Sequence, residues 1–138
     1  MSAGAPLRLA ILISGRGSNM SAVAQACRDG RIGAKVSLVA ADRADAGGLE
    51  IAQRLGLETT AVPRERFADR AAFEAGLDAA LAKAGFDLIV LAGFMRVLSP
   101  EFAARHAGRI LNIHPSLLPK YRGLHTHQRV LEASDREH

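Results

Sequence analysis

The residue types best suited to chemistry stand close together near position 113. Asn112 and His114 are separated by one residue and follow the run Arg109-Ile110-Leu111, which is typical of a buried strand. Alternate residues on a strand share a face, so both side chains can reach one reacting atom. A carboxamide N–H can stabilise a developing oxyanion, and an imidazole can carry a proton near neutral pH. The pair therefore indicates catalysis, although a purely structural histidine stays an equal alternative at this point.

A glycine-rich loop, Ser14-Gly-Arg-Gly-Ser-Asn19, indicates a different chemistry. It follows an apolar strand pattern and precedes a helical one. Gly15 and Gly17 permit backbone conformations that other residues resist, and the N–H groups at a helix start suit a phosphate. The side chains of Ser18 and Asn19 add hydrogen-bond donors. We therefore favour a phosphate site, and a tight strand–helix turn that merely needs glycine is the alternative.

A further loop, Gly93–Leu98, is apolar apart from Arg96 and follows the most apolar strand pattern of the chain. Taken alone, it is typical of a core segment with one solvated arginine. Apolar side chains with exposed main-chain groups also suit a flat heterocycle, so a ligand-binding wall is the second interpretation.

Other patterns carry less weight. Met20 stands where a dinucleotide fingerprint needs its third glycine, so we expect Asp42 in an ordinary strand-end turn rather than on a ribose. His125 and His127 have no cysteine or carboxylate cluster beside them, and we expect no metal site. Cys27 falls on the apolar stripe of a helix, where a packed thiol is expected.

Strands and helices alternate along the chain, and this alternation predicts how the loops are positioned. Apolar runs predict strands at Leu7–Ile13, Lys35–Ala41, Leu57–Val62, Asp87–Ala92 and Arg109–Ile113. Helical patterns follow the glycine loop and occupy Asp45–Leu55, Arg70–Ala84, Ser99 to about Ala107, and Thr126 to Ala133. We predict an α/β fold with a Rossmann-like, open, mainly parallel sheet and helices on both faces. The loops after the first, fourth and fifth strands then share the carboxyl edge of the sheet, where ligands bind.

Composition limits the classes of function. The chain has 138 residues, of which 49% are apolar and 23% charged, so we expect a tail at residues 1–6 and one domain over 7–138. The net charge of +4 comes from scattered basic residues, which favours a small anionic substrate over nucleic acid. The single cysteine suits a reducing cytoplasm. No 18-residue apolar run or signal-peptide pattern occurs, so we expect a cytoplasmic protein without a membrane span.

Several motifs, in this order, resemble the folate-dependent formyltransferase family, and in particular its phosphoribosylglycinamide (glycinamide ribonucleotide) branch. Asn112-x-His with the following Ser-Leu-Leu-Pro119 is shared across the wider family, including the methionyl-tRNA enzyme and formyltetrahydrofolate deformylase. The Gly-Ser-Asn19 loop and His125-Thr-His127 indicate the phosphoribosylglycinamide branch. The resemblance covers residues 7–138 and also includes the stretches Ala44–Glu50 and Leu91–Arg96.

The resemblance implies a reaction and a set of residues. The formyl group of 10-formyltetrahydrofolate would pass to the amine of 5'-phosphoribosylglycinamide, a step of de novo purine biosynthesis. By this resemblance the catalytic residues are Asn112 and His114, with the carboxamide on the formyl oxygen and the imidazole moving the proton. The ribonucleotide phosphate would lie on Gly17, Ser18 and Asn19. The folate would contact Arg70, Met95, Arg96, Val97, Leu98 and Asn112.

The resemblance also leaves expectations open. Family members continue past position 138 with an Asp-bearing loop and further strands, so we expect the C-terminal part of the family fold to be absent and turnover by such a chain to be weak. The alternatives are another formyl-handling enzyme, such as the deformylase, or a non-catalytic module that binds phosphate or nucleotide. A homodimer is an open expectation for the assembly.

Overall fold

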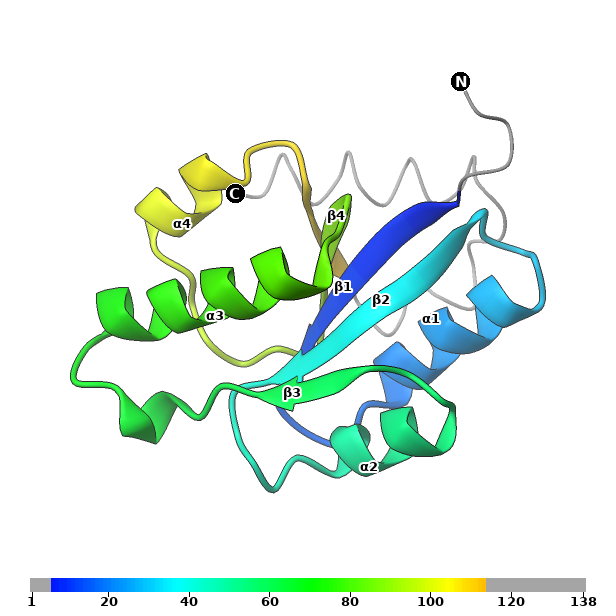
Figure 1. Ribbon diagram of the computed structural model, residues 1–138, viewed down its shortest axis with the longest axis horizontal. Helices are drawn as coiled ribbons and strands as arrows, with labels where there is room; N and C mark the ends of the chain where they lie inside the picture. The colour runs from blue at the N-terminus through cyan, green and yellow to red at the C-terminus, as the bar shows by residue number, and fades with distance from the viewer. Residues whose placement is uncertain (1–5, 114–138) are drawn as a thin grey trace.

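The computed structural model of this chain describes residues 6–113, which form a parallel sheet covered by helices (Figure 1). The strands are β1 (Leu7–Ile13), β2 (Ala34–Ala41), β3 (Thr59–Ala61), β4 (Leu88–Ala92) and β5 (Ile110–Ile113). The helices are α1 (Ser18–Arg28), α2 (Gly47–Arg54), α3 (Arg70–Ala84) and α4 (Pro100–Arg105), with a 3₁₀ turn η1 (Arg64–Arg66) before α3.

The five strands are ordered β3-β2-β1-β4-β5, and every neighbouring pair is parallel. The chain adds strands outward from β1 through β2 to β3. The connection through α3 then returns the chain to the middle of the sheet, where β4 pairs with the other side of β1. The order reverses between β1 and β4. In open α/β sheets the crevice outside such a reversal is where ligands bind.

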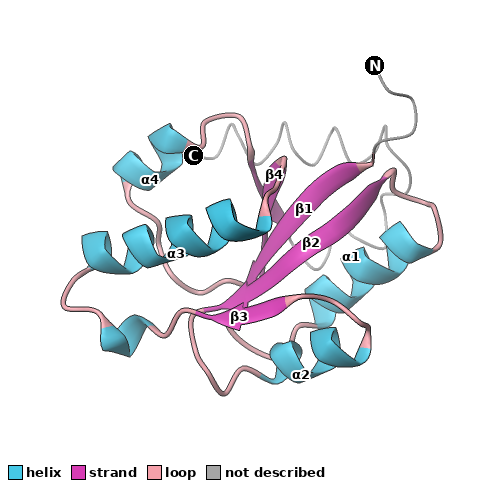
Figure 2. Ribbon diagram, viewed as in Figure 1, coloured by secondary structure: helices cyan, strands magenta, loops and turns pink. Residues whose placement is uncertain are grey.

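Alternate residues of the strands bury two separate layers of side chains. Leu9, Ile11 and Ile13 of β1 pack with Met20 and Val23 of α1 on one face of the sheet. Ala10 and Leu12 pack on the other face, with Phe73, Leu77 and Leu81 of α3 and Phe102 of α4. Figure 2 shows α3 and α4 on the left side of the strands and α1 and α2 on the other side, at the lower right. The predicted fold class is therefore confirmed, with helices on both faces.

The predicted boundaries are shortened where pairing stops. The predicted strand Leu57–Val62 is reduced to Thr59–Ala61, because it pairs only with Val39, Ala40 and Ala41 of β2. Helix α4 ends at Arg105 rather than near Ala107. The 3₁₀ turn η1 was not predicted, and the predicted helix at Thr126–Ala133 lies outside the described residues.

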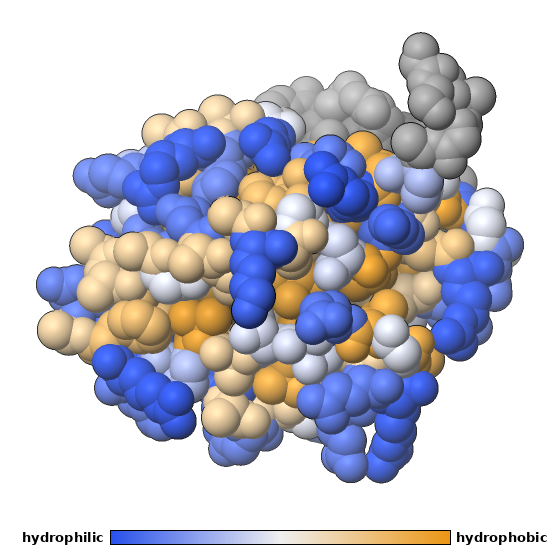
Figure 3. Space-filling model, in the orientation of Figure 1, coloured by the Kyte–Doolittle hydropathy of each residue, from blue (hydrophilic) through white to orange (hydrophobic). Residues whose placement is uncertain are grey.

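In the view of Figure 3 the most hydrophilic residues lie mainly toward the outline of the molecule, and the most hydrophobic ones show mainly in its middle. A shallow hollow of about 380 Å³ lies on β2, β3 and α3, lined by side chains such as Leu38, Thr60 and Ala80. Within residues 6–113, no helix is long and apolar enough to cross a membrane.

Candidate functional site

The loops after β1 and β4 are joined directly at the point where the strand order reverses. The N–H of Ser14 donates to the carbonyl oxygen of Gly93 at 3.2 Å, and the N–H of Met95 donates to the Ser14 hydroxyl at 2.8 Å. Ser14 is only 5% exposed. One buried serine therefore fixes the distance between the glycine loop and the Gly93–Leu98 loop, as the shared carboxyl edge predicted.

The glycine loop also packs against the start of α2. Gly17 is the N-cap of α1 and has a φ of +77°, a backbone conformation that only glycine adopts without strain. The N–H of Gly48 donates to the carbonyl oxygen of Gly15 at 2.9 Å. A Cβ on Gly48 would lie 2.5 Å from Ile13 Cδ1 and 3.0 Å from Gly17 Cα, so both positions require glycine for the close approach.

Two helix starts therefore meet at this loop, and neither has a side-chain cap. The N-caps are Gly17 for α1 and Ala46 for α2, whereas Asp69 and Ser99 cap α3 and α4 with their side chains. The N–H groups of a helix's first turn have no partner inside the helix and carry the positive end of its dipole. This arrangement suits an anion beside the predicted phosphate residues, of which Ser18 is exposed and Asn19 half-buried.

A cavity of about 480 Å³ opens between the Gly93–Leu98 loop, α4 and β5. Its wall includes four of the residues expected to contact folate, namely Arg96, Val97, Leu98 and Asn112. The remaining wall is largely apolar and consists of Leu91, Phe94, Ala103, His106, Ala107, Gly108 and Ile110. A flat, mostly apolar ligand with a few polar edges fits such a wall.

The other predicted site residues lie outside this wall. Met95 is 80% exposed on the loop, and Arg70 is the exposed first residue of α3. Gly17, Ser18 and Asn19 belong to the start of α1 and do not line the cavity. His114 lies outside the described residues, so its predicted position beside Asn112 stays a prediction.

Asp42 does more than form the ordinary strand-end turn that we expected. Its side chain is 2% exposed, and its Oδ2 accepts a hydrogen bond of 2.6 Å from Nε of Arg96, which is 44% exposed. The contact joins residues 54 apart in sequence. No local sequence pattern predicts this contact. Only the position of Asp42 at the end of a strand could have indicated that it has a role at the site.

Two contacts join α3 to the residues at the two ends of α4, of which His106 lines the cavity. The buried carboxylate of Glu74 accepts from the Ser99 N–H at 2.7 Å and from the Ser99 hydroxyl at 2.5 Å. Nε2 of His106 lies 2.7 Å from Oδ1 of Asp78. Sequence reasoning missed Glu74, although a carboxylate directly after the apolar Phe73 on a buried helix is a signal that could have found it.

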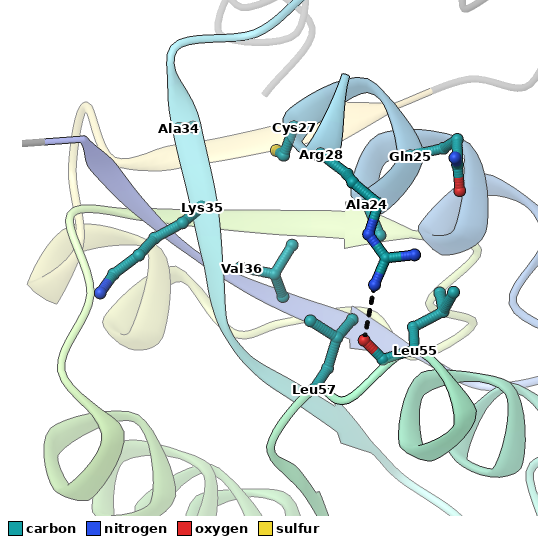
Figure 4. Close-up of a pocket in the computed structure, with 9 residues that line it drawn as sticks. All are labelled: Ala24, Gln25, Cys27, Arg28, Ala34, Lys35, Val36, Leu55 and Leu57. Carbon is teal, nitrogen blue, oxygen red and sulfur yellow. Dashed lines mark hydrogen bonds between the residues drawn. The ribbon is translucent and has the colours of Figure 1, made fainter. Parts of the chain in front are cut away.

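A separate cavity of about 230 Å³ lies at the opposite edge of the sheet, where β2 begins (Figure 4). Arg28 donates there to the carbonyl oxygen of Leu55 at 3.2 Å. Cys27 lies on its wall, and burial raises the pKa of the thiol above its ordinary value. A thiol with a raised pKa is less reactive than that of a solvent-exposed cysteine, which agrees with the packed role expected for Cys27.

The described part of the chain contains no group of three or more His, Cys, Asp or Glu side chains that could hold a metal ion.

Known proteins are similar to this chain over most of its length. A family model described as formyl transferase matches residues 7–138. The phosphoribosylglycinamide formyltransferase of Escherichia coli K12 is 47% identical over 132 residues, which are 96% of this chain and 62% of that protein. The chain thus spans less than two thirds of this relative's length.

Solved structures agree with this match. The phosphoribosylglycinamide formyltransferase from Brucella melitensis is 48% identical with a TM-score of 0.77, over 94% of this chain and 68% of that one. The enzyme of the same name from Coxiella burnetii is 44% identical, also with a TM-score of 0.77, over 95% and 62% of the two chains. Because the family model matches residues 7–138, and the parallel sheet with its carboxyl-edge loops lies within that range, the chain belongs to the formyl transferase family.

Proposed function

We propose that this chain carries the substrate-binding core of a phosphoribosylglycinamide formyltransferase, which moves the formyl group of 10-formyltetrahydrofolate onto the amine of 5'-phosphoribosylglycinamide in purine biosynthesis. The observation that carries the proposal is the cavity that joins Arg96, Val97 and Leu98 to Asn112 at the carboxyl edge of the sheet. It occurs in a chain that is 47% identical to an enzyme of that name.

The phosphate of the ribonucleotide is assigned to Gly17, Ser18 and Asn19. Support comes from the two helix starts that meet at this loop without side-chain caps. The Ser18 and Asn19 side chains add donors next to these main-chain N–H groups, as a phosphate requires.

The folate is assigned to the cavity beside α4, with its flat ring system against Val97 and Leu98. The apolar wall and the volume of about 480 Å³ fit a bicyclic heterocycle. Met95 and Val97 are 80% and 79% exposed, and such exposed apolar side chains on a loop are typical of a ligand contact. Arg70 is proposed for the anionic end of the folate, as the resemblance implies.

The catalytic roles are assigned to Asn112 and His114. The co-substrate supplies the formyl group, and the new bond joins the ribonucleotide's amine nitrogen to the formyl carbon as the bond from that carbon to folate nitrogen breaks. The Asn112 carboxamide donates to the formyl oxygen while it carries negative charge. The His114 imidazole accepts the proton that the amine loses and returns a proton to the leaving nitrogen.

A single-turnover experiment with the chain in excess tests this assignment, because it detects transfer even where steady turnover is weak. We expect the formylated ribonucleotide to form only when both substrates are present, and Asn112→Ala to slow its formation about 10²–10³-fold without weakening nucleotide binding. Loss of the formyl group to water without the ribonucleotide would instead support a deformylase. Ligand binding without any transfer would support a non-catalytic nucleotide-binding module.

We further propose a cytoplasmic enzyme that acts on small molecules, does not bind nucleic acid and forms a homodimer. The single cysteine supports a reducing compartment. Several arginines are paired with carboxylates, such as Arg8 with Asp87 and Arg43 with Asp45, which leaves fewer cations for a nucleic acid backbone. Sedimentation of the chain and a filter-binding assay with random-sequence DNA check the last two points.

A further inference from the structure

Arg96 lies on the boundary between two cavities at the carboxyl edge of the sheet. On one side is the cavity of about 480 Å³ that contains Asn112. On the other side is a cavity of about 510 Å³, whose wall consists of Asp42, Arg43, Ala44, Asp45, Glu65 and Arg96 itself. A change in the direction of the Arg96 guanidinium would therefore alter the charge that both cavities present.

The Asp42 carboxylate fixes that direction through one edge of the guanidinium. Nε of Arg96 donates to Oδ2 of Asp42 at 2.6 Å, which is short for a charge-assisted hydrogen bond. Among the described residues, the two Nη groups of Arg96 have no hydrogen-bond partner, and the side chain is 44% exposed. The two Nη groups, with which arginine binds carboxylates and phosphates, are thus held in place and remain available to a ligand.

The environment of Asp42 argues against a purely stabilising ion pair. Its side chain is 2% exposed, and its buried Oδ1 has no hydrogen-bond partner among residues 6–113. Burying a carboxylate is costly unless all of its lone pairs are satisfied, and a buried ion pair often adds no net stability. A carboxylate that keeps one unsatisfied buried oxygen is better explained by the orientation it gives to Arg96 than by a gain in stability.

We propose that Asp42 is a positioning residue that holds the Arg96 guanidinium at the boundary of the two cavities so that its Nη edge binds an anionic group of a substrate. The inference rests on the proposed function, which supplies two candidate oxyanions. These are the glutamate carboxylates of the folate and the phosphate of the ribonucleotide. Asp42 itself touches neither, and it acts only through Arg96.

The test measures equilibrium binding to the full chain and to Asp42→Asn by calorimetry, with probes that carry different anionic groups. The probes are pteroylglutamate, pteroate (the same ring system, which ends in its benzoate carboxylate and lacks the glutamate carboxylates) and ribose 5-phosphate. We expect Asp42→Asn to weaken pteroylglutamate about tenfold, as for a loosened charge-assisted contact, and to leave pteroate unchanged. Weakening of ribose 5-phosphate instead identifies the phosphate as the anion.

Asp45→Asn is the matched control. Asp45 lies on the same cavity wall and its loss removes the same charge, but its partner is Arg43, at 3.0 Å. We expect this variant to bind all three probes like the wild-type chain. An equal effect of Asp45→Asn and Asp42→Asn would show that only the net charge of the cavity matters and would overturn the inference.

A double-mutant cycle with Arg96→Lys separates positioning from a general structural role. Lysine keeps the charge but has neither the Nε contact nor the two Nη groups, so Asp42→Asn should have no further effect in this background. A persistent effect there, or equal weakening of pteroate and pteroylglutamate, would overturn the inference. A wild-type chain that binds neither folate probe would instead defeat the proposed function.

Discussion

Asn112 is the described residue whose chemistry the proposed reaction needs most. It lies on β5 and lines the cavity beside α4. Removing one oxyanion donor typically costs about 10²–10³ in rate. We therefore expect Asn112→Ala to lower the single-turnover rate by roughly that factor and to leave the affinity for ribose 5-phosphate unchanged, measured by rapid quench and by calorimetry. An unchanged rate would remove Asn112 from the catalytic role.

Asp87 gives a prediction about pH at the opposite edge of the sheet. Its carboxylate accepts from the Arg8 side chain at 3.2 Å and from the Arg8 N–H at 2.8 Å, and these contacts lower its pKa below the ordinary 3.8. A group whose pKa is lowered on folding stabilises the protein above its unfolded pKa and loses this contribution as the pH falls through its folded pKa.

Asp87→Asn should therefore be less stable than the wild-type chain at neutral pH, and the difference should shrink as the pH falls below about 4. Urea unfolding followed at several pH values measures this difference. A gap that stays constant down to the lowest pH would show that the Asp87–Arg8 contact does not depend on the carboxylate charge.

Among the helices, α4 depends on α3 for its position. The buried Glu74 of α3 accepts both the N–H and the hydroxyl of Ser99, which in turn caps α4 by accepting from the N–H of Phe102. Glu74→Ala leaves these donors buried without a partner, which costs about 1–3 kcal/mol. We expect unfolding in urea at a correspondingly lower concentration, whereas Glu101→Ala, on the exposed side of α4, should change stability little.

The elements were predictable where local periodicity decides their structure. Helix α3 was predicted with its observed ends, because apolar residues recur at helical spacing between Arg70 and Gly85. The helical pattern was predicted to start at Ser99, which is the observed N-cap of α4. The short β3 was not predictable in this way, since pairing with β2 rather than local pattern sets where it begins and ends. The three-residue 3₁₀ turn η1 is too short to show a helical periodicity.

Across the whole molecule, stability should follow the strand order. β1 lies between β2 and β4, and its residues Leu9 to Ile13 are fully buried, whereas β3 is an edge strand of partly exposed residues. Amide hydrogen exchange should therefore be slowest in β1 and β4 and faster in β3. Equal protection of β3 and β1 would contradict this order.

The site as a whole was only partly predictable. The sequence placed the glycine loop, the Gly93–Leu98 loop and Asn112 at one edge, because parallel strands send their loops to the same side. It could not report that Asp42 meets Arg96 or that Glu74 meets Ser99, since these pairs are 54 and 25 residues apart and depend on the order of the strands. Long-range pairs of this kind leave no local periodicity.

The close contact of Gly17 with Gly48 restricts how this protein could be redesigned. A Cβ at position 48 would lie 3.0 Å from Gly17 Cα, so a mutant library that varies the glycine loop must keep both Gly17 and Gly48. The exposed Arg16 and Ser18 and the half-buried Asn19 point to where new sequence can be introduced instead. Engineers seeking altered ligand preference therefore have three adjustable positions on a backbone whose shape is already set.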